Sequence, residues 1–298
     1  TVHTVPTPNI GGLAMLCGLA VALVVARQMD RFDRLFTGNS ELIGVFLAAL
    51  IIALVGLRDD VREVSAPGRV AATIAAGLVL VWFGVTMFYF RLPFLGVFQI
   101  SGDWVPIVTV LWLLVMTQAI NLIDGLDGLA AGIVAIGSGA FFVYSWHLSD
   151  KGLLSEPNIG PLIAVVTCGV CIGFLPFNFN PARIFMGDSG SYLLGLLMAV
   201  STSVVGGRAD PSTQGFSGQT YFFLAPLFIP LIILGVPIFD VLFAIVRRVS
   251  RGTGFATADK GHLHHRLINL GHGPRRAVVI LWAWTLLLSG FVLYPVFN

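Results

Sequence analysis

Residues 104–123 have the sequence WVPIVTVLWLLVMTQAINLI, and residues 128–147 have the sequence GLAAGIVAIGSGAFFVYSWH. Each run has the length, about 20 predominantly apolar residues, that an α-helix needs to cross a bilayer. A short segment separates the two runs, and it contains the carboxylates Asp124 and Asp127. We therefore predict two consecutive membrane-spanning helices with an acidic segment between them.

The composition of the whole chain favours the same fold class. Of the 298 residues, 56% are hydrophobic and 11% are charged, against roughly 25% charged residues in soluble domains, and the mean hydropathy is +0.90. A soluble fold of this size needs more polar surface, so a soluble globular enzyme is excluded. The net charge is +2, and no segment has the density of basic residues that nucleic-acid binding requires. The sequence predicts an integral membrane protein with no nucleic-acid partner.

Apolar runs of sufficient length predict an all-α fold, a polytopic helical bundle that forms a single domain over residues 1–298. The nine predicted spans are 11–28, 41–57, 70–90, 104–123, 128–147, 159–176, 189–206, 220–246 and 276–297. The 220–246 run contains three prolines between residues 226 and 237, so we expect that helix to be broken. The sequence begins at Thr1 among polar and proline-rich residues, and we expect an N-terminal segment with a further span to be missing.

The distribution of basic residues predicts the orientation of these spans. Segments 1–10, 58–69, 124–127, 177–188 and 247–275 lie on one side, and the remaining connections lie on the other. With residues at span ends counted with the nearer segment, 11 of the 17 Lys and Arg residues fall on the first side and 6 on the second. The positive-inside rule places the first side in the cytoplasm, which predicts a multi-pass protein of the plasma membrane.

Five polar clusters lie on this predicted cytoplasmic side, and the other side has nothing comparable. They are PTPNIGG (6–12) with the preceding His3, Arg58-Asp59-Asp60, NLIDGLDG (121–128), FNFNPARIFMGDSGS (177–191) and KGHLHHR (260–266). We predict that they assemble one site.

The residue types in the clusters indicate phosphoryl transfer. The candidate acids, all at the ends of apolar runs, are Asp59, Asp60, Asp124, Asp127 and Asp188. Neighbouring carboxylates raise one another's pKa, a conflict that a divalent cation removes, and an all-oxygen set favours Mg²⁺ or Mn²⁺ over zinc. The candidate donors to an anionic ligand are His262, His264, His265 and Arg266. Acids, a divalent cation and a basic clamp together are typical of phosphoryl transfer.

Simpler explanations stay open for several of these residues. Asp59 and Asp60 could form a solvated helix end, and Asp127 could be the N-cap of the next helix. The histidine spacing in 262–265 is also compatible with a transition metal. Asp240, the one acid within a predicted span, could serve a structural pair or the site.

Two other functional classes were weighed against phosphoryl transfer. A secondary transporter would have acids near mid-span and inverted repeats, and neither occurs in the sequence. An intramembrane aspartyl protease would explain Gly187-Asp188, but it also requires a Tyr-Asp element that the sequence lacks.

In these motifs the sequence resembles the polyprenyl-phosphate N-acetylhexosamine-1-phosphate transferases, the WecA/MraY-like family. The matching stretches follow the family's order over nearly the whole chain: PTPNIGG (6–12), Asp59-Asp60, NLIDGLDGLAAG (121–132), FNFNPARIFMGDSGS (177–191) and HLHHRL (262–267). Within the family, PTPNIGG and HLHHR look more like the WecA/TagO branch than the branch that transfers phospho-N-acetylmuramoyl-pentapeptide, which stays as the alternative.

The resemblance implies transfer of N-acetylhexosamine-1-phosphate, in this branch GlcNAc-1-phosphate, from a UDP-sugar to a polyprenyl phosphate with release of UMP. It also implies a requirement for Mg²⁺, with Mn²⁺ as a substitute, and inhibition by tunicamycin. We expect the broken 220–246 helix to contribute to the lipid groove, and a homodimer is a further expectation.

The same resemblance implies a role for each motif residue. We expect Asp188 to be the main Mg²⁺ ligand and Asp127 to complete the site. Asp59 and Asp60 would position or deprotonate the lipid phosphate. The pyrophosphate would be held by His262, His264, His265 and Arg266. The nucleotide would contact Asn121, Asp124, Asn178 and Phe185, with Phe185 stacking on the uracil ring and Asn178 hydrogen-bonding to it.

Overall fold

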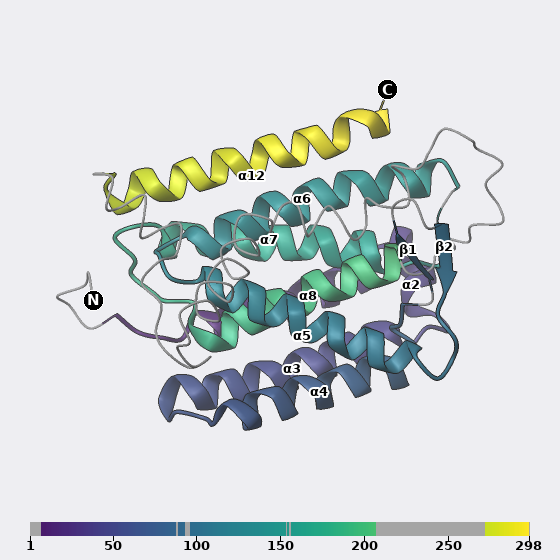
Figure 1. Cartoon of the computed structure of the whole chain (residues 1–298), viewed down its shortest axis with the longest axis horizontal. Coiled ribbons are helices and arrows are strands. Elements are labelled where there is room, and N and C mark those ends of the chain that lie inside the picture. Colours follow the sequence, from purple (N-terminus) through teal and green to yellow (C-terminus); the bar gives the residue numbers. More distant parts are fainter. Residues whose placement is uncertain are drawn as a thin grey trace.

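The computed structural model describes residues 7–87, 89–92, 96–152, 154, 156–206 and 272–297. Long helices dominate this part of the chain (Figure 1). They are α1 (Gly11–Arg27), α3 (Glu41–Val61), α4 (Ala66–Trp82), α5 (Val105–Ile123), α6 (Leu129–Asp150), α7 (Gly160–Asn178), α8 (Gly187–Gly206) and α12 (Pro274–Phe297). Two short helices, η1 (Asp30–Phe32) and α2 (Asp33–Phe36), follow α1, and the strands β1 (Tyr89–Leu92) and β2 (Gly96–Gln99) follow α4.

The helices confirm a multi-pass membrane protein, and the predicted number of nine spans is not confirmed by the described residues. Within the described ranges, six helices are long and apolar enough to cross a membrane, or seven if α1 and the η1–α2 segment, which meet at a bend of 94°, count as one span. The predicted 220–246 span and its proline break lie outside the described residues.

The predicted 70–90 span is wrong in its second half. Helix α4 ends at Trp82, because Gly84 adopts a left-handed φ of +86° and closes the helix with backbone bonds from Gly84 to Val81 and from Val85 to Leu80. The chain then enters the antiparallel β1–β2 hairpin, in which Tyr89 pairs with Gln99. The all-α prediction therefore needs one small hairpin added, and α4, with 17 residues, is a short apolar helix.

Helix α8 is the centre of the bundle, packed against α1, α3, α5, α6 and α7 (Figure 1). Of its most apolar 18-residue window, 94% is buried inside the protein. Small residues make this possible: a Cβ atom on Gly195 would lie 2.5 Å from the Thr117 Cα of α5, so the two helices touch through their backbones. The first turn of α8 is thereby fixed at one end of the bundle, among the ends of other helices.

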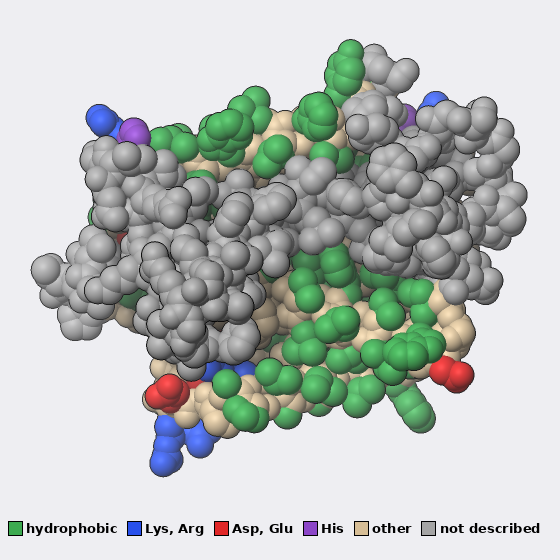
Figure 2. Space-filling view, in the orientation of Figure 1, with side chains coloured by type: hydrophobic (Ala, Val, Ile, Leu, Met, Phe, Trp, Pro, Cys, Tyr) green, Lys and Arg blue, Asp and Glu red, His purple; other side chains and the backbone are tan. Residues whose placement is uncertain are grey.

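The outer surface of the bundle is apolar. Figure 2 shows hydrophobic side chains along the visible flank and charged side chains near its ends. On α12, for example, Leu286, Leu287 and Phe291 are each more than 60% exposed. Large exposed apolar side chains on consecutive helices are the surface that hydrocarbon solvates in a membrane.

Candidate active site

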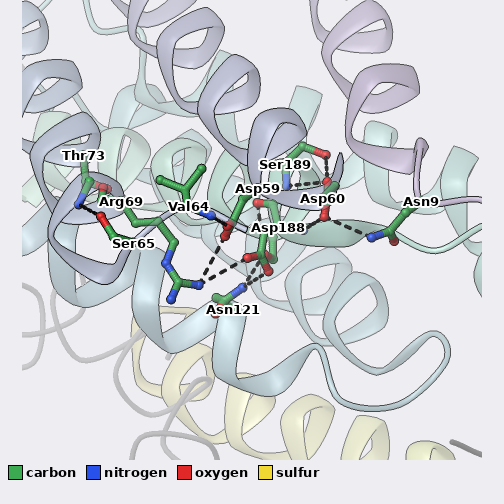
Figure 3. A network of polar contacts seen from close by, with 12 residues as sticks. Asn9, Asp59, Asp60, Val64, Ser65, Arg69, Thr73, Asn121, Asp188 and Ser189 are labelled. Carbon is green, nitrogen blue, oxygen red and sulfur yellow. Dashed lines mark hydrogen bonds and ion pairs between the residues drawn. The ribbon is translucent and has the colours of Figure 1, made fainter. Parts of the chain in front are cut away.

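Asp60, from the last turn of α3, closes the N-terminus of α8. Its Oδ1 accepts hydrogen bonds from the Asp188 backbone N–H at 2.8 Å and from Asn9 Nδ2 at 3.0 Å, and its Oδ2 accepts from the Ser189 hydroxyl at 2.8 Å and the Ser189 backbone N–H at 3.2 Å (Figure 3). A carboxylate at this position satisfies two free N–H groups of α8 and is stabilised by the helix dipole. With four donors on its two oxygens, Asp60 is a structural anchor of the site.

Glycines allow the ends of α1, α3 and α8 to approach one another closely. Gly187 has a φ of +70°, and a Cβ atom there would lie 2.5 Å from Asp60 Oδ2. A Cβ atom on Gly56 of α3 would lie 2.4 Å from the Ser189 Cα, and one on Gly12 of α1 would lie 2.2 Å from the Ser189 hydroxyl. The ends of α1, α3 and α8 therefore form a tightly packed acidic centre around Asp60 and Asp188.

Besides the side-chain bond of Asn9, the PTPNIGG motif makes contacts through its backbone. The Gly11 and Gly12 N–H groups donate to the carbonyls of Phe185 and Met186, each at 3.0 Å, and the Phe185 N–H donates to the Pro8 carbonyl at 2.9 Å. Pro8, before α1, and the first two residues of α1 are thus bound to the residues that lead into α8.

Arg69 of α4 lies between two of the predicted catalytic carboxylates. Its Nη1 is 3.2 Å from Asp59 Oδ2 and 3.6 Å from Asp188 Oδ2 (Figure 3). Asp59 also accepts from the Val64 N–H, and its side chain is only 5% exposed, whereas those of Arg69 and Asp188 are each 31% exposed. One guanidinium therefore offsets the charge of both carboxylates, and Asp188 is the more accessible of the two.

Asn121, at the end of α5, orients Asp188. Its Nδ2 donates to Asp188 Oδ1 at 2.7 Å and to the Ser191 hydroxyl at 3.0 Å. Asp188 Oδ1 is thus held by Asn121, and Oδ2 faces the Arg69 guanidinium. Asn121, which was predicted to contact the nucleotide, lies beside the predicted metal ligand Asp188. Its amide group positions the Asp188 carboxylate.

Asp124 follows α5 and faces the same centre. Burial, followed by the negative charges of Asp188, Asp60 and Asp127, raises the pKa of Asp124 from 3.8 to about 7. The surrounding carboxylates add to the effect of burial, because each disfavours a further negative charge beside it. The structure thus brings Asp60, Asp124, Asp127 and Asp188 close enough to interact electrostatically.

Asp127 holds the loop between α7 and α8. Its Oδ2 accepts from Asn180 Nδ2 at 2.9 Å and from the Ala182 N–H at 3.1 Å. Gly128, next to it, has a φ of +78° and donates its N–H to Asn178 Oδ1 at 3.0 Å. The acidic segment between the two central spans is therefore bound to the FNFNPAR segment.

The predicted uridine contacts lie in this loop in different environments. Asn178 is 3% exposed, and its Nδ2 donates to the Ile184 carbonyl at 3.0 Å, so both ends of its amide group are used within the protein. Asn178 therefore links Gly128 to the segment before α8, a structural role that the sequence did not predict. Phe185 is half-buried, and stacking on uracil stays a prediction for it.

Six polar residues singled out in the sequence, among them the predicted basic clamp, fall outside the part of the chain that the structure describes. His262, His264, His265, Arg266, His3 and Asp240 are outside the described residues. Across the described ranges, no three His, Cys, Asp or Glu side chains are arranged to hold a metal ion between them.

Sequence reasoning missed two contributors to the acidic centre, Arg69 and Asn9. Arg69 lies ten residues after Asp59 in a segment with Arg58 and Arg62, and composition alone gives no reason to prefer one of the three. Asn9 lies within the PTPNIGG motif, and its polar side chain between Pro8 and Ile10 was a usable signal. Both meet the aspartates only because the start of α1 and helix α4 converge on the end of α3.

Residues 42–206 match the family described as glycosyl transferase family 4. The match covers α3 to α8, and with them Asp59-Asp60, NLIDGLDG and the segment before α8. It therefore includes the described parts of the acidic centre except the start of α1 and the residues before it.

Three relatives illustrate the similarity to individual proteins. A decaprenyl-phosphate N-acetylglucosaminephosphotransferase of Mycobacterium leprae is 38% identical, over 95% of this chain and 72% of that protein. A probable undecaprenyl-phosphate N-acetylglucosaminyl 1-phosphate transferase of Bacillus subtilis is 34% identical, over 98% and 72%. A phospho-N-acetylmuramoyl-pentapeptide-transferase of Bacillus subtilis is 30% identical, over 97% and 83%. By these matches the chain belongs to glycosyl transferase family 4, together with the polyprenyl-phosphate sugar phosphotransferases that its motifs resemble.

Proposed function

We propose that this protein transfers GlcNAc-1-phosphate from UDP-GlcNAc to a membrane polyprenyl phosphate, releasing UMP. A phosphate oxygen of the lipid would attack the β-phosphorus of the donor, and the bond from that phosphorus to the oxygen bridging to the α-phosphate would break. The products would be UMP and a polyprenyl-pyrophosphate sugar. The observation that carries the proposal is the acidic centre, formed by Asp59, Asp60, Asp188 and Asn121 within the family match.

The position of the centre suits the two substrates. It lies at the ends of apolar helices, where a lipid could enter from the bilayer and a nucleotide from the aqueous phase. The excess of Lys and Arg on this side supports a cytoplasmic position in the plasma membrane. The relatives support the acceptor class, since two of them are named for polyprenyl phosphates.

We propose Mg²⁺ as the cofactor, with Asp188 as its first protein ligand. The fit rests on donor chemistry: burial, followed by the negative charges of Asp188, Asp60 and Asp127, raises the pKa of Asp124 to about 7, and a cation bound among these carboxylates would reduce their repulsion. Mg²⁺ is commonly held by one or two carboxylates, with substrate phosphates and water completing the shell. When bound, the ion would neutralise phosphate charge. Asp188 is better placed than Asp127, because both hydrogen bonds of Asp127 Oδ2 go to the 180–182 loop.

The protein's own groups have separate tasks in this proposal. Asn121 orients Asp188, and Arg69 offsets the repulsion between Asp59 and Asp188. Asp59 and Asp60 are engaged by donors, so we assign them an electrostatic and positioning role. The lipid phosphate is already largely anionic near pH 7, and its attack needs no general base.

The test is release of UMP by the purified protein in lipid nanodiscs. We expect UMP when UDP-GlcNAc, a polyprenyl phosphate and Mg²⁺ are all present, loss of release with EDTA, and inhibition by tunicamycin. UDP-GalNAc, the C4 epimer, and UDP-N-acetylmuramoyl-pentapeptide serve as competing donors. The GlcNAc donor is favoured because identity is 38% with the GlcNAc relative and 30% with the pentapeptide one. Release from the pentapeptide donor alone would assign the chain to the other branch.

A further inference from the structure

The first turn of α12 touches the loop that carries the FNFNPAR segment. Arg275 Nε donates to the Asn180 carbonyl at 2.8 Å and lies 3.3 Å from Asn180 Oδ1. Arg275 is separated by 95 residues from Asn180 along the chain, so only the packing of α12 brings them together. The neighbouring Arg276 is also exposed but forms no comparable contact among the described residues.

Asn180 relays this contact to Asp127. The Asn180 side chain accepts from Arg275 at Oδ1 and donates from Nδ2 to Asp127 Oδ2 at 2.9 Å, where the Ala182 N–H also donates. In such a chain each hydrogen bond polarises the next, because the amide group accepts at one end while it donates at the other. Arg275 therefore acts on the position of Asp127 without touching it.

The two ends of the loop before α8 are held very differently. The end at residues 184–186 is fixed by backbone bonds to the segment before α1 and by the Asn178 amide. The end at residues 180–182 has hydrogen bonds to only two other parts of the described chain, Asp127 and Arg275. Loss of Arg275 would therefore leave the 180–182 end with Asp127 as its remaining hydrogen-bond partner in the described chain, while the 184–186 end keeps all its contacts.

Helix α12, which carries Arg275, is held in place by its packing against α6. A Cβ atom on Gly132 of α6 would lie 2.0 Å from Trp282 Nε1, which means that the indole fills a notch left by the missing side chain. The same indole lies 5.5 Å from the Phe179 ring, centroid to centroid. The helix thus contacts the loop at two points about two turns apart, through Trp282 and Arg275.

We propose that Arg275 is a positioning residue for the donor: through Asn180 it holds Asp127 and the 180–182 loop in the geometry that receives the nucleotide-sugar. The proposal rests on the proposed function for its kinetic part. Its structural part, that Arg275 orders the 180–182 loop, does not depend on any substrate.

The experiment compares Arg275→Gln with Arg276→Gln in the full chain in nanodiscs. The two variants lose the same charge from adjacent exposed positions, but only the first loses the bonds to Asn180. We expect peptides covering residues 179–183 to exchange amide hydrogen about three to ten times faster in Arg275→Gln, and at the wild-type rate in Arg276→Gln. Peptides covering 184–187 should not change in either variant. Equal exchange in the two variants would overturn the proposal.

Kinetics supply the second readout. In Arg275→Gln we expect the KM for UDP-GlcNAc to rise about three- to tenfold while the KM for polyprenyl phosphate stays within twofold. Arg275→Lys, which keeps one donor, should recover part of the loss. Faster exchange with an unchanged donor KM would mean a purely structural contact and would overturn the positioning role. A wild-type protein that releases no UMP would instead refute the proposed function. The hydrogen-exchange data would still test whether Arg275 orders the 180–182 loop.

Discussion

The acidic centre at Asp60 and Asp188 and the loop edge at Asp127 and Asn180 are built in different ways. In the centre, helix ends touch backbone to backbone through Gly12 and Gly56, Gly187 leaves room for the Asp60 carboxylate, and Asp60 receives four hydrogen bonds. At the edge, single side-chain hydrogen bonds hold a loop, and the last of them comes from an exposed arginine. The centre is therefore suited to fixed geometry, and the edge to adjustment around a ligand.

The largest effect should come from the centre, at its accessible carboxylate. Asp188→Asn preserves shape but removes the negative charge that Asn121 and Arg69 orient. We expect UMP release to fall by at least about 10³-fold, because the charge that holds the cation is lost. Thermal unfolding in detergent should match that of Asp150→Asn, an exposed control on α6. Activity above a tenth of wild type would remove Asp188 from the metal site.

The next effect tests whether the centre is as rigid as its contacts indicate. Gly187→Ala forces a non-glycine residue to a φ of +70° and places a Cβ atom 2.5 Å from Asp60 Oδ2. Gly38→Ala is the matched control, since Gly38 has a φ of +77° but open space around it. We expect about 1–2 kcal/mol of strain in both variants, and about 2 kcal/mol more for Gly187→Ala from disturbed hydrogen bonds.

Thermal unfolding of the two glycine variants separates strain from collision. Gly187→Ala should unfold at a clearly lower temperature than Gly38→Ala and should lose most of its UMP release. Equal unfolding temperatures would show that Asp60 moves aside without cost, and the centre would then be no more rigid than the edge.

A smaller effect should follow from changing the charge balance of the centre. Arg69→Ala leaves Asp59 and Asp188 without the guanidinium between them. We expect kcat/KM to fall about tenfold, a value reduced for solvent screening because Arg69 is partly exposed. Arg62→Ala, an exposed arginine in the same segment, should stay within twofold of wild type. A comparable loss in both variants would point to overall charge as the cause.

The smallest effect should appear where the centre meets the edge, at Asp124. Its pKa is raised from 3.8 to about 7, so ionisation favours the unfolded state: the destabilisation begins near pH 4, grows as the pH rises and is complete above about pH 7. Asp124→Asn should therefore raise the unfolding temperature of the metal-free protein by about 1–3 °C at pH 8, with no gain near pH 4. Asp103→Asn, at the other end of α5, is the control. Saturating Mg²⁺ should reduce the gain, and a gain that is independent of pH would contradict the carboxylate repulsion.

Local sequence patterns were enough to find most of the helices. Apolar runs predicted α3, α5, α6, α7 and α8 to within a few residues, because the requirement to bury the backbone in hydrocarbon acts on each segment separately. The pattern failed after Trp82, where a left-handed Gly84 ends α4 although the residues that follow are still apolar. Hydropathy measures solvent preference, and it does not register the backbone conformation that stops a helix.

Sequence alone also determined which segments carry the chemistry, since polar residues at the ends of apolar runs are costly unless they serve a site or a helix end. It could not determine what each carboxylate does. Asp60 meets the N–H groups of residues 128 and 129 positions away, and Asp59 meets Arg69 on a different helix. Asn178, expected to bind uridine, has both ends of its amide group bound within the protein. Hydrogen-bond partners so distant in sequence are chosen by helix packing, and only the tertiary structure could assign the neighbouring aspartates different roles.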